Sequence, residues 1–369
     1  MNSAAVNLLL AGDVMTGRGI DQILRHPSEP VLHESWAKSA MDYVELAERR
    51  NGPIPRSVGD EYIWGDALDT LGRSDLAARI VNLETAVTVN DMPWVGKGIN
   101  YRMHPANVER TVAGRADCCV LANNHVLDWG YSGLEETVAS LQDSGLRPVG
   151  AGHDALAAAR PVRIQRAPGR AVVVVALGTI SSGIPASWAA REDRPGVALA
   201  RSLGSAEIDA VAASVATVAR ANDVVVASIH WGGNWGYVIP KAHRRFARAL
   251  IAEAGVHVVH GHSSHHPLGM EVYRGRLILY GCGDLINDYE GIQGHEQFQP
   301  DLGLLYLATI DPKGALEHLE LIPLRRRLFR LQAASSEERS WLQQRLTEHG
   351  RSLGTRVNVS REGNLALDW

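Results

Sequence analysis

The chain has 369 residues, of which 45% are hydrophobic and 21% are charged, as is usual for a globular protein with a substantial core. The formal net charge of -4, without any run of like charges, argues against a nucleic-acid partner. Three cysteines give no disulfide framework and favour a reducing compartment. The N-terminal segment shows neither a signal peptide nor a membrane span, so we expect a cytoplasmic protein with no membrane partner.

The first part of the chain predicts two buried strands separated by an elaborated loop. VNLLLAGD (residues 6–13) is an expected strand, and a short helix follows it near residues 20–24. The polar segment 26–60 bears several prolines and an amphipathic helix over residues 36–49. LAARIVNLET (residues 76–85) is the next expected strand. We therefore expect segment 26–60 to be a loop that covers a site.

The rest of the chain alternates apolar, β-branched runs with helical stretches, which is typical of strands covered on both faces. The expected strands are residues 117–125, 147–152, 171–179, 223–232 and 256–262. The expected helices are residues 132–144, 206–221, 241–254 and 336–349. A hairpin over residues 271–288 and a meander over residues 301–326 complete the prediction.

Side chains that bind metals follow several of the predicted strands. These residues are Asp13, Glu84, Asn124, His125, His230, His262 and His265. A sheet places such side chains together at its carboxyl edge, so we expect them to meet. Imidazole, carboxylate and amide oxygen together suit one or two divalent ions, which we expect to be Zn, Mn, Fe, Ni or Co.

Each of these segments also has an ordinary structural explanation. Asp13 fits a helix cap, the Asn124–His125 pair fits a turn, and His230 fits a hydrogen-bonded core histidine. The densest signal is HGHSSHHP, residues 260–267, which holds four histidines. A cluster of that kind, combined with the other strand ends, predicts a catalytic metal centre.

Six blocks of the sequence resemble, in order, the signature blocks of CapA-like proteins in the calcineurin-like metallophosphoesterase superfamily. The blocks are GDVMTGRGID, NLETAVT, LANNHVLDWG, HWGGNW, HGHSSHHP and YGCGDLIND. CapA itself is linked to capsule or poly-γ-glutamate synthesis. The resemblance implies an α/β fold, namely the four-layer α-β-β-α sandwich of two mixed sheets known as the metallo-dependent phosphatase fold. It assigns that fold to residues 1–325 and leaves residues 326–369 as a helical and extended C-terminal extension packed on the same domain.

The resemblance also implies a role for each strand-end residue. Asp13 is similar to the first-metal ligand, Glu84 to the bridging carboxylate and His125 to the acid/base residue. The remaining implied metal ligands are Asn124, His230, His262 and His265.

Three departures from the family pattern shape the functional hypothesis. The usual Asp-x-His is Asp13-Val14-Met15, no membrane anchor precedes the first strand, and His295 stands where relatives have tyrosine. The chain in this respect resembles soluble CapA-like epimerases of lasso-peptide biosynthesis. We therefore expect a metal-dependent epimerase that inverts the Cα of the C-terminal residue, taken to be Trp, of a precursor peptide. His295 would exchange the α-proton on one face, and His125 or a neighbouring residue would serve the other.

The glycine- and aromatic-rich loop over residues 93–105 is the expected holder of the peptide end. Lys97 or Arg102 would pair with its carboxylate, and Trp94 lies in the same loop. Trp231, directly after His230, would pack against an aromatic side chain of the peptide or belong to the core.

Two other functions remain open at this point. The first is hydrolysis of a phosphoester or a γ-glutamyl bond, which the ancestry of the fold favours. The second is non-enzymatic binding of a capsule polymer by a protein that keeps the ligand cluster as a relic. Fold ancestry alone does not choose among the three.

Overall fold

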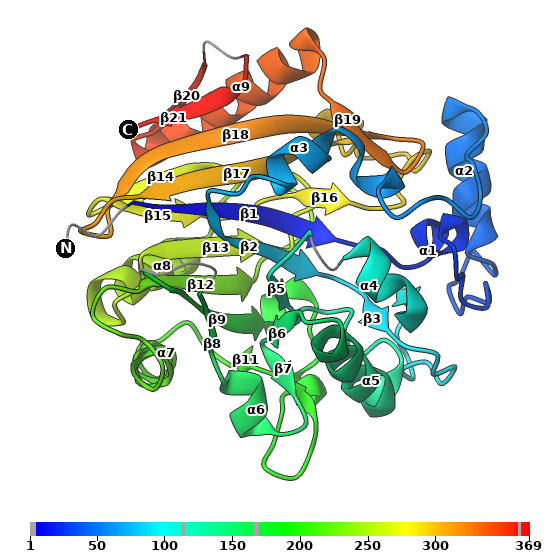
Figure 1. The fold of residues 1–369 in the computed structure, drawn as a ribbon, viewed down its shortest axis with the longest axis horizontal. Coiled ribbons are helices and arrows are strands. Elements are labelled where there is room, and N and C mark those ends of the chain that lie inside the picture. The colour runs from blue at the N-terminus through cyan, green and yellow to red at the C-terminus, as the bar shows by residue number, and fades with distance from the viewer. Residues whose placement is uncertain (1–4, 113–114, 166–169, 361–362) are drawn as a thin grey trace.

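Two β-sheets packed face to face form the centre of the computed structural model, which describes residues 5–112, 115–165, 170–360 and 363–369. Helices cover the outer faces of both sheets (Figure 1). The predicted four-layer α-β-β-α arrangement of two mixed sheets is confirmed.

The first sheet has ten strands, with β1 (Val6–Val14) near its middle. Its path is β20 (Arg356–Val359), β21 (Leu365–Asp368), β18 (Leu316–Arg327), β17 (Leu302–Ile310), β1, β2 (Leu76–Leu83), β5 (Cys118–Val120) and β6 (Arg147–Val149). Two more strands lie off this path, β16 (Asp284–Ile286) beside β1 and β19 (Arg330–Ala333) beside β18. The strands β16, β1, β2, β5 and β6 are parallel, so their carboxyl ends share one edge.

The second sheet has seven strands and, unlike the first, is mostly parallel. Its path is β11 (Leu199–Ala200), β9 (Val172–Thr179), β12 (Val224–His230), β13 (Val258–His262), β15 (Arg276–Leu279) and β14 (Met270–Tyr273), and β8 (Val162–Ile164) pairs with β9. Two small ladders, β3 (Ala86–Val87) with β4 (Arg102–Met103) and β7 (Ala151–Gly152) with β10 (Gly196–Val197), stand apart.

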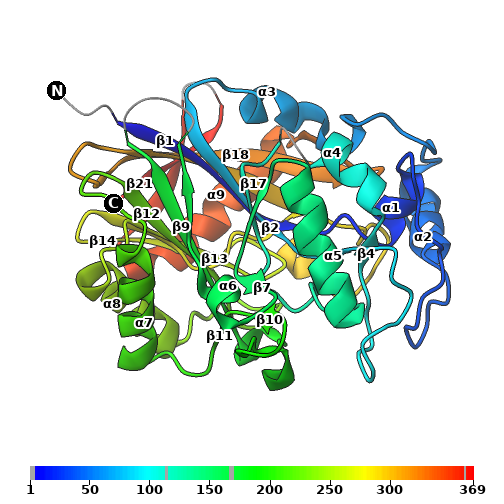
Figure 2. The same cartoon turned by 60° about the horizontal axis from the view of Figure 1, so that its bottom comes forward.

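Alternation along the strands divides the apolar side chains among three layers of core. In β9, Val172 and Val174 pack between the sheets, whereas Val173 and Val175 pack against the outer helices. The helices of the described chain are α1 (Gly19–Ile23), α2 (Met41–Asn51), α3 (Leu68–Leu71), α4 (Val108–Thr111), α5 (Gly130–Asp143), α6 (Ala155–Ala159), α7 (Ser205–Ala216), α8 (Lys241–Glu253) and α9 (Ser336–Gly350). Figure 2 shows α7 and α8 beside β9 and β12, and α4 and α5 near the end of β2.

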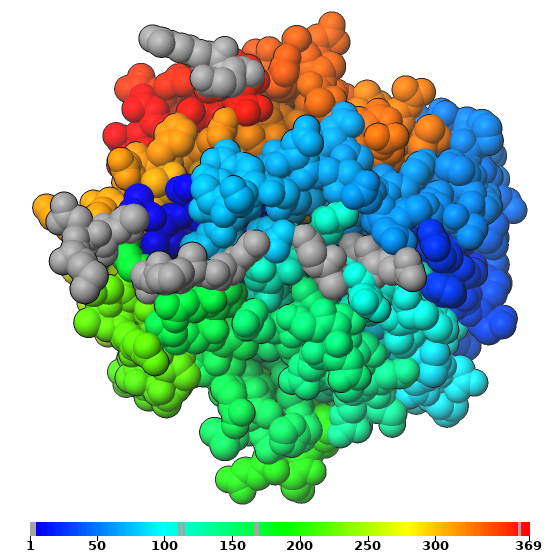
Figure 3. Space-filling model, in the orientation of Figure 1, coloured from blue at the N-terminus to red at the C-terminus, as the bar shows by residue number. Residues whose placement is uncertain are grey.

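The segment between α2 and β2 crosses the middle of one face, between the C-terminal strands and the central part of the chain (Figure 3). The predicted helix over residues 36–49 begins later in the structure, at Met41. The side chain of Asp42 accepts hydrogen bonds from the backbone N–H groups of Lys38 and Ser39, so the preceding residues turn instead of continuing the helix.

The C-terminal residues join the first sheet. Strands β19 and β21 both pair with β18, along the edge opposite β17. The predicted division after residue 325 falls within β18 and stays a prediction. None of the helices in the described parts of the chain combines the length and apolar character that crossing a bilayer requires.

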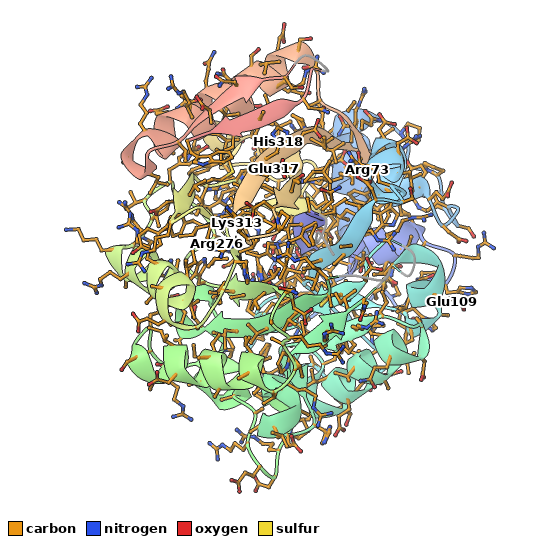
Figure 4. The ribbon with its side chains drawn as sticks, turned by 60° about the vertical axis from the view of Figure 1, so that its left-hand side comes forward. Arg73, Glu109, Arg276, Lys313, Glu317 and His318 are labelled. Atoms are coloured by element: carbon orange, nitrogen blue, oxygen red, sulfur yellow. The ribbon has the colours of Figure 1, made fainter. Side chains whose placement is uncertain are left out.

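The two sheets are also joined at the edge opposite the carboxyl ends. Figure 4 shows Arg276, in β15, close to Lys313, in the turn between β17 and β18. The Arg276 guanidinium donates to the Lys313 carbonyl oxygen at 3.0 Å, and the Leu316 N–H donates to the Gly275 carbonyl oxygen at 2.7 Å. These bonds fix the relative position of the two sheets.

A register shift in β1 lies at Gly12 and Asp13, where the pairing with both β2 and β16 slips. The Asp13 N–H donates to the carbonyl oxygen of Gly283 at 3.1 Å. A Cβ atom on Gly12 would lie only 1.7 Å from that same oxygen. The bulge thus depends on glycine, and it directs the Asp13 side chain to the edge of the sheet.

The substitution Gly12→Ala is expected to lower the free energy of unfolding by about 3 kcal/mol or more. The added methyl group would overlap the Gly283 carbonyl oxygen, so β1 would have to move away from the residues that precede β16. Thermal and urea unfolding of the purified protein would measure the loss. Gly59→Ala is the matched control, since a Cβ there meets nothing within 4 Å. Equal unfolding midpoints for the two variants would contradict this account of the bulge.

Candidate metal centre

The strand-end residues predicted from the sequence meet at the carboxyl edge of both sheets. The first sheet supplies Asp13 from β1, Glu84 just after β2, and Asn124 and His125 after β5. The second sheet supplies His230 and His262 as the last residues of β12 and β13. The His260 imidazole, 2.9 Å from the Ala11 carbonyl oxygen, ties β13 to β1 across the sandwich.

Three buried carboxylates form the acidic part of the site, namely those of Asp13, Glu84 and Asp284. The side-chain amide of Asn82 donates to Asp13 Oδ1 at 2.8 Å and to Glu84 Oε2 at 3.1 Å. Burial, and secondly the charge of Asp284, raises the pKa of Asp13 to about 7. Burial, followed by the charge of Asp13, holds the pKa of Glu84 well above its usual value. The site therefore concentrates more negative charge than its own hydrogen bonds stabilise.

The histidines His230 and His262 complete the first group of donors. Their Nδ1 atoms lie 2.8 Å apart, and His230 Nε2 lies 2.9 Å from Asn124 Oδ1. Burial, followed by the neighbouring histidines, lowers the pKa of both imidazoles well below the usual value, so both are neutral at pH 7. Asp13, His230 and His262 each offer a ligand atom, and these atoms lie within 4.8 Å of one another.

A second group of donors consists of Asp13, His265 and Asp284, whose ligand atoms also lie within 4.8 Å of one another. His265 Nδ1 is 2.9 Å from Asp284 Oδ1. Burial lowers the pKa of His265, but the charge of Asp284 and this hydrogen bond outweigh burial and raise it. Asp13 is common to both groups, whereas Glu84 Oε1 lies 3.8 Å from His125 Nε2 and 3.9 Å from His230 Nε2.

These residues fit one or two divalent ions. Buried carboxylates that repel one another and neutral imidazoles that converge on the same space are the arrangement that a cation stabilises. Carboxylate and imidazole donors suit Zn, Mn, Fe, Ni and Co alike.

His125 lies beside the carboxylates with its own supporting pair. Its Nδ1 is 2.7 Å from Asp128 Oδ2 and 3.1 Å from the Lys97 ammonium. Lys97 in turn is 2.6 Å from Asp128 Oδ1. Burial, followed by the charge of Lys97, lowers the pKa of His125 to about 4, so the imidazole is neutral at pH 7. Lys97, expected to bind a substrate carboxylate, instead has its ammonium in contact with Asp128 and His125.

Two other residues predicted to bind substrate, Arg102 and Trp231, have partners within the protein. Arg102 donates to the carbonyl oxygens of Asn90 and Glu29, both at 2.9 Å, and its guanidinium stacks on Trp129. Trp231 is buried, stacks on His243 at 4.5 Å and donates its indole N–H to the Tyr280 carbonyl oxygen, so it is a core residue. Both terminal nitrogens of Arg102 and the indole nitrogen of Trp231 thus already donate to backbone carbonyl oxygens.

Trp94 and His295 occupy the surroundings of the site. Trp94 makes edge contacts with Tyr131 and Trp188, at 5.4 and 5.3 Å between ring centroids. His295 stacks on Trp235 at 3.9 Å, and Trp235 packs against His265 at 5.3 Å. His265 of the centre and His295 therefore both contact the ring of Trp235.

Three residues of the site were not singled out from the sequence: Asn82, Asp128 and Asp284. Asn82 is a polar residue inside the buried strand β2, and Asp128 follows His125 by three positions. Asp284 belongs to the YGCGDLIND block but was given no role. The available signal for Asn82 was a polar residue within the apolar run at residues 80–83 that ends β2.

The pKa values predict how metal binding depends on pH. Asp13 holds a proton below about pH 7, and the raised pKa of His265 acts in the same direction, so protons compete with the metal. Affinity for Zn²⁺ or Mn²⁺ should fall by about tenfold for each pH unit below 7 and level off above it. Competition with a chromophoric chelator between about pH 6 and 8 measures this dependence. An affinity that does not change across this range would contradict it.

The sequence of the chain is similar to those of several bacterial proteins. Residues 7–289 match the family described as "Bacterial capsule synthesis protein PGA_cap". The chain is 48% identical over 366 residues to a probable polyglutamine synthesis accessory protein of Mycobacterium tuberculosis, covering 99% of this chain and 96% of that protein. It is 25% identical over 278 residues to the PGA biosynthesis protein CapA of Bacillus subtilis, covering 75% of this chain and 62% of that protein.

These relatives correct the functional hypothesis. Their names refer to polyglutamine, PGA and capsule biosynthesis, so the expectation of a lasso-peptide epimerase is wrong. In the structure the ring of His295, the proposed proton-transfer group, stacks on Trp235, and it is Trp235 that contacts His265 of the centre. The CapA-like resemblance itself is confirmed. The chain belongs to the bacterial capsule synthesis protein PGA_cap family.

Proposed function

We propose that this chain is a metal-dependent hydrolase that cleaves a phosphoester or γ-glutamyl bond during the synthesis of a glutamate polymer. The observation that carries the proposal is the His125–Asp128 pair, set beside the buried carboxylates and histidines at the edge of both sheets. The polymer is taken from the names of the relatives, which refer to PGA and polyglutamine synthesis.

The donors of the centre define where the metal would be held. Asp13, His230 and His262, with Asn124 beside them, would hold one ion. The residues Asp13, His265 and Asp284 would hold a second. A bound divalent ion supplies Lewis-acid polarisation of the scissile group and lowers the pKa of water.

The role that we assign to His125 is proton transfer through its Nε2 atom. Asp128 Oδ2, which only accepts, lies 2.7 Å from Nδ1, whereas the Lys97 ammonium, which only donates, lies 3.1 Å from the same atom. The shorter contact favours the Nδ1–H tautomer, in which the Nε2 lone pair is on the side of Glu84. Lys97 balances the charge of Asp128 and helps to keep the imidazole neutral. His125 is then ready to accept a proton from water near the centre and to return it to the leaving group.

One observation favours a second candidate, a polymer-binding factor without catalysis. The relative that is 48% identical is named an accessory protein, a word that does not require turnover. Chelation separates the two functions, because polymer binding without catalysis does not need the metal to activate water.

The test uses metal-loaded protein with a generic phosphoester and with poly-γ-glutamate. His125→Gln is expected to lower kcat on the hydrolysed substrate by about 10²- to 10⁴-fold. Elemental analysis should show an unchanged content of bound metal. The reason is that His125, held by Asp128, carries protons and is not a metal ligand.

His153→Gln is the matched control, because His153 is an exposed histidine paired only with its neighbour Asp154 at 3.2 Å. Its kcat should equal that of the unmodified protein. Absence of turnover on both substrates, together with polymer binding that survives chelation, would replace the hydrolase by the accessory factor.

A further inference from the structure

Tyr289 reaches the metal centre from the same segment that supplies Asp284. Its ring meets the His265 ring edge-on at 5.2 Å between centroids. The Asn287 side chain links the two, donating to Asp284 Oδ2 at 2.6 Å and accepting from the Tyr289 N–H at 3.1 Å. Tyr289 is partly exposed, whereas residues 281–288 are buried. Tyr289 is therefore the first residue of this segment that has surface exposed to solvent.

The hydroxyl group of Tyr289 lies next to a second phenol, that of Tyr101. Tyr101 donates a long hydrogen bond of 3.4 Å to the Tyr289 oxygen. The Tyr101 ring lies edge-on to His125 at 4.6 Å, so the two phenols bridge the space between His125 and His265. Within the described residues, no protein acceptor is recorded for the hydroxyl hydrogen of Tyr289. That hydrogen is free to point at a bound molecule.

A buried ion-pair cluster fixes both phenols from behind. The Arg18 guanidinium lies 4.1 Å from the Tyr101 ring centroid and 5.9 Å from that of Tyr289. It binds both oxygens of Asp288, the residue before Tyr289, at 3.1 and 2.5 Å. It also pairs with Glu34 at 3.1 Å. Bidentate pairing of this kind holds a side chain in one geometry.

We propose that Tyr289 donates a hydrogen bond to the substrate oxygen that gains negative charge during hydrolysis. The proposal rests on the hydrolase function and adds to it a substrate-contacting residue opposite His125. The proton stays on the phenol throughout, so the role is stabilisation of charge and not transfer of a proton. A fixed donor aimed at developing charge is among the stronger contributions to catalysis.

Inorganic phosphate serves as the probe, because it is a tetrahedral oxyanion that resembles the reacting group of either candidate substrate. Titration calorimetry of the metal-loaded protein should show phosphate binding that Tyr289→Phe weakens by about tenfold or more, as expected for a lost hydrogen bond to a charged group. The bound metal, measured by elemental analysis, should be unchanged. On a hydrolysed substrate, kcat should fall by about 10²-fold with KM nearly constant.

Tyr62→Phe is the matched control, since it removes a hydroxyl that donates to the Leu328 carbonyl oxygen at 2.9 Å, in the segment that precedes β2. Phosphate affinity equal in Tyr289→Phe and Tyr62→Phe would overturn the proposal, as would loss of metal from Tyr289→Phe or failure of the unmodified protein to bind phosphate. If Tyr289→Phe weakens phosphate binding but the unmodified protein hydrolyses nothing, the hydrolase function fails and with it the catalytic role of Tyr289, and only its hydrogen bond to a bound anion stands.

Discussion

Repulsion among three buried carboxylates is the constraint on which the rest of the site depends. Asp13, Glu84 and Asp284 are nearly inaccessible to water, and burial raises the pKa of the first two. Such groups are costly unless a cation or hydrogen bonds compensate them. The protein supplies only part of that compensation, through the amide of Asn82, the Ser263 N–H and the pair with His265. The remainder defines the place of a divalent ion.

The fold holds these carboxylates in place through backbone geometry more than through side-chain contacts. Strand β1 pairs with β2 on one side and with β16 on the other, and the bulge at Gly12 turns Asp13 toward the edge. The buried Arg326 guanidinium donates to the carbonyl oxygens of Asp284 at 2.5 Å and Leu302 at 3.1 Å, so it binds β16 to β17. The acidic cluster is therefore part of the framework of the fold. A movement of these carboxylates would also disrupt the pairing of the central strands.

The sequence predicted those features that depend on local pattern. Apolar runs ending in ligand-type residues located Asp13, His230 and His262, because parallel strands bring their carboxyl ends to a common edge. Asp284 was missed because its short strand joins β1 over a separation that no local pattern reveals. Trp231 and Arg102 were given to the substrate because composition does not show which way a side chain points. The core stacking on His243 and the bonds to Asn90 and Glu29 decide that.

The expectation of an epimerase rested in part on the departure from Asp-x-His, in which Met15 stands in place of a metal-binding histidine. The structure removes that premise, because His265 and Asp284 supply donors on the same side as Asp13. Inversion at a carbon requires proton carriers on both of its faces, yet of the two histidines proposed for that task, His125 lies 3.8 Å from Glu84 whereas His295 stacks on Trp235. One proton carrier beside a cluster of metal donors meets the needs of hydrolysis, in which water is the second reactant.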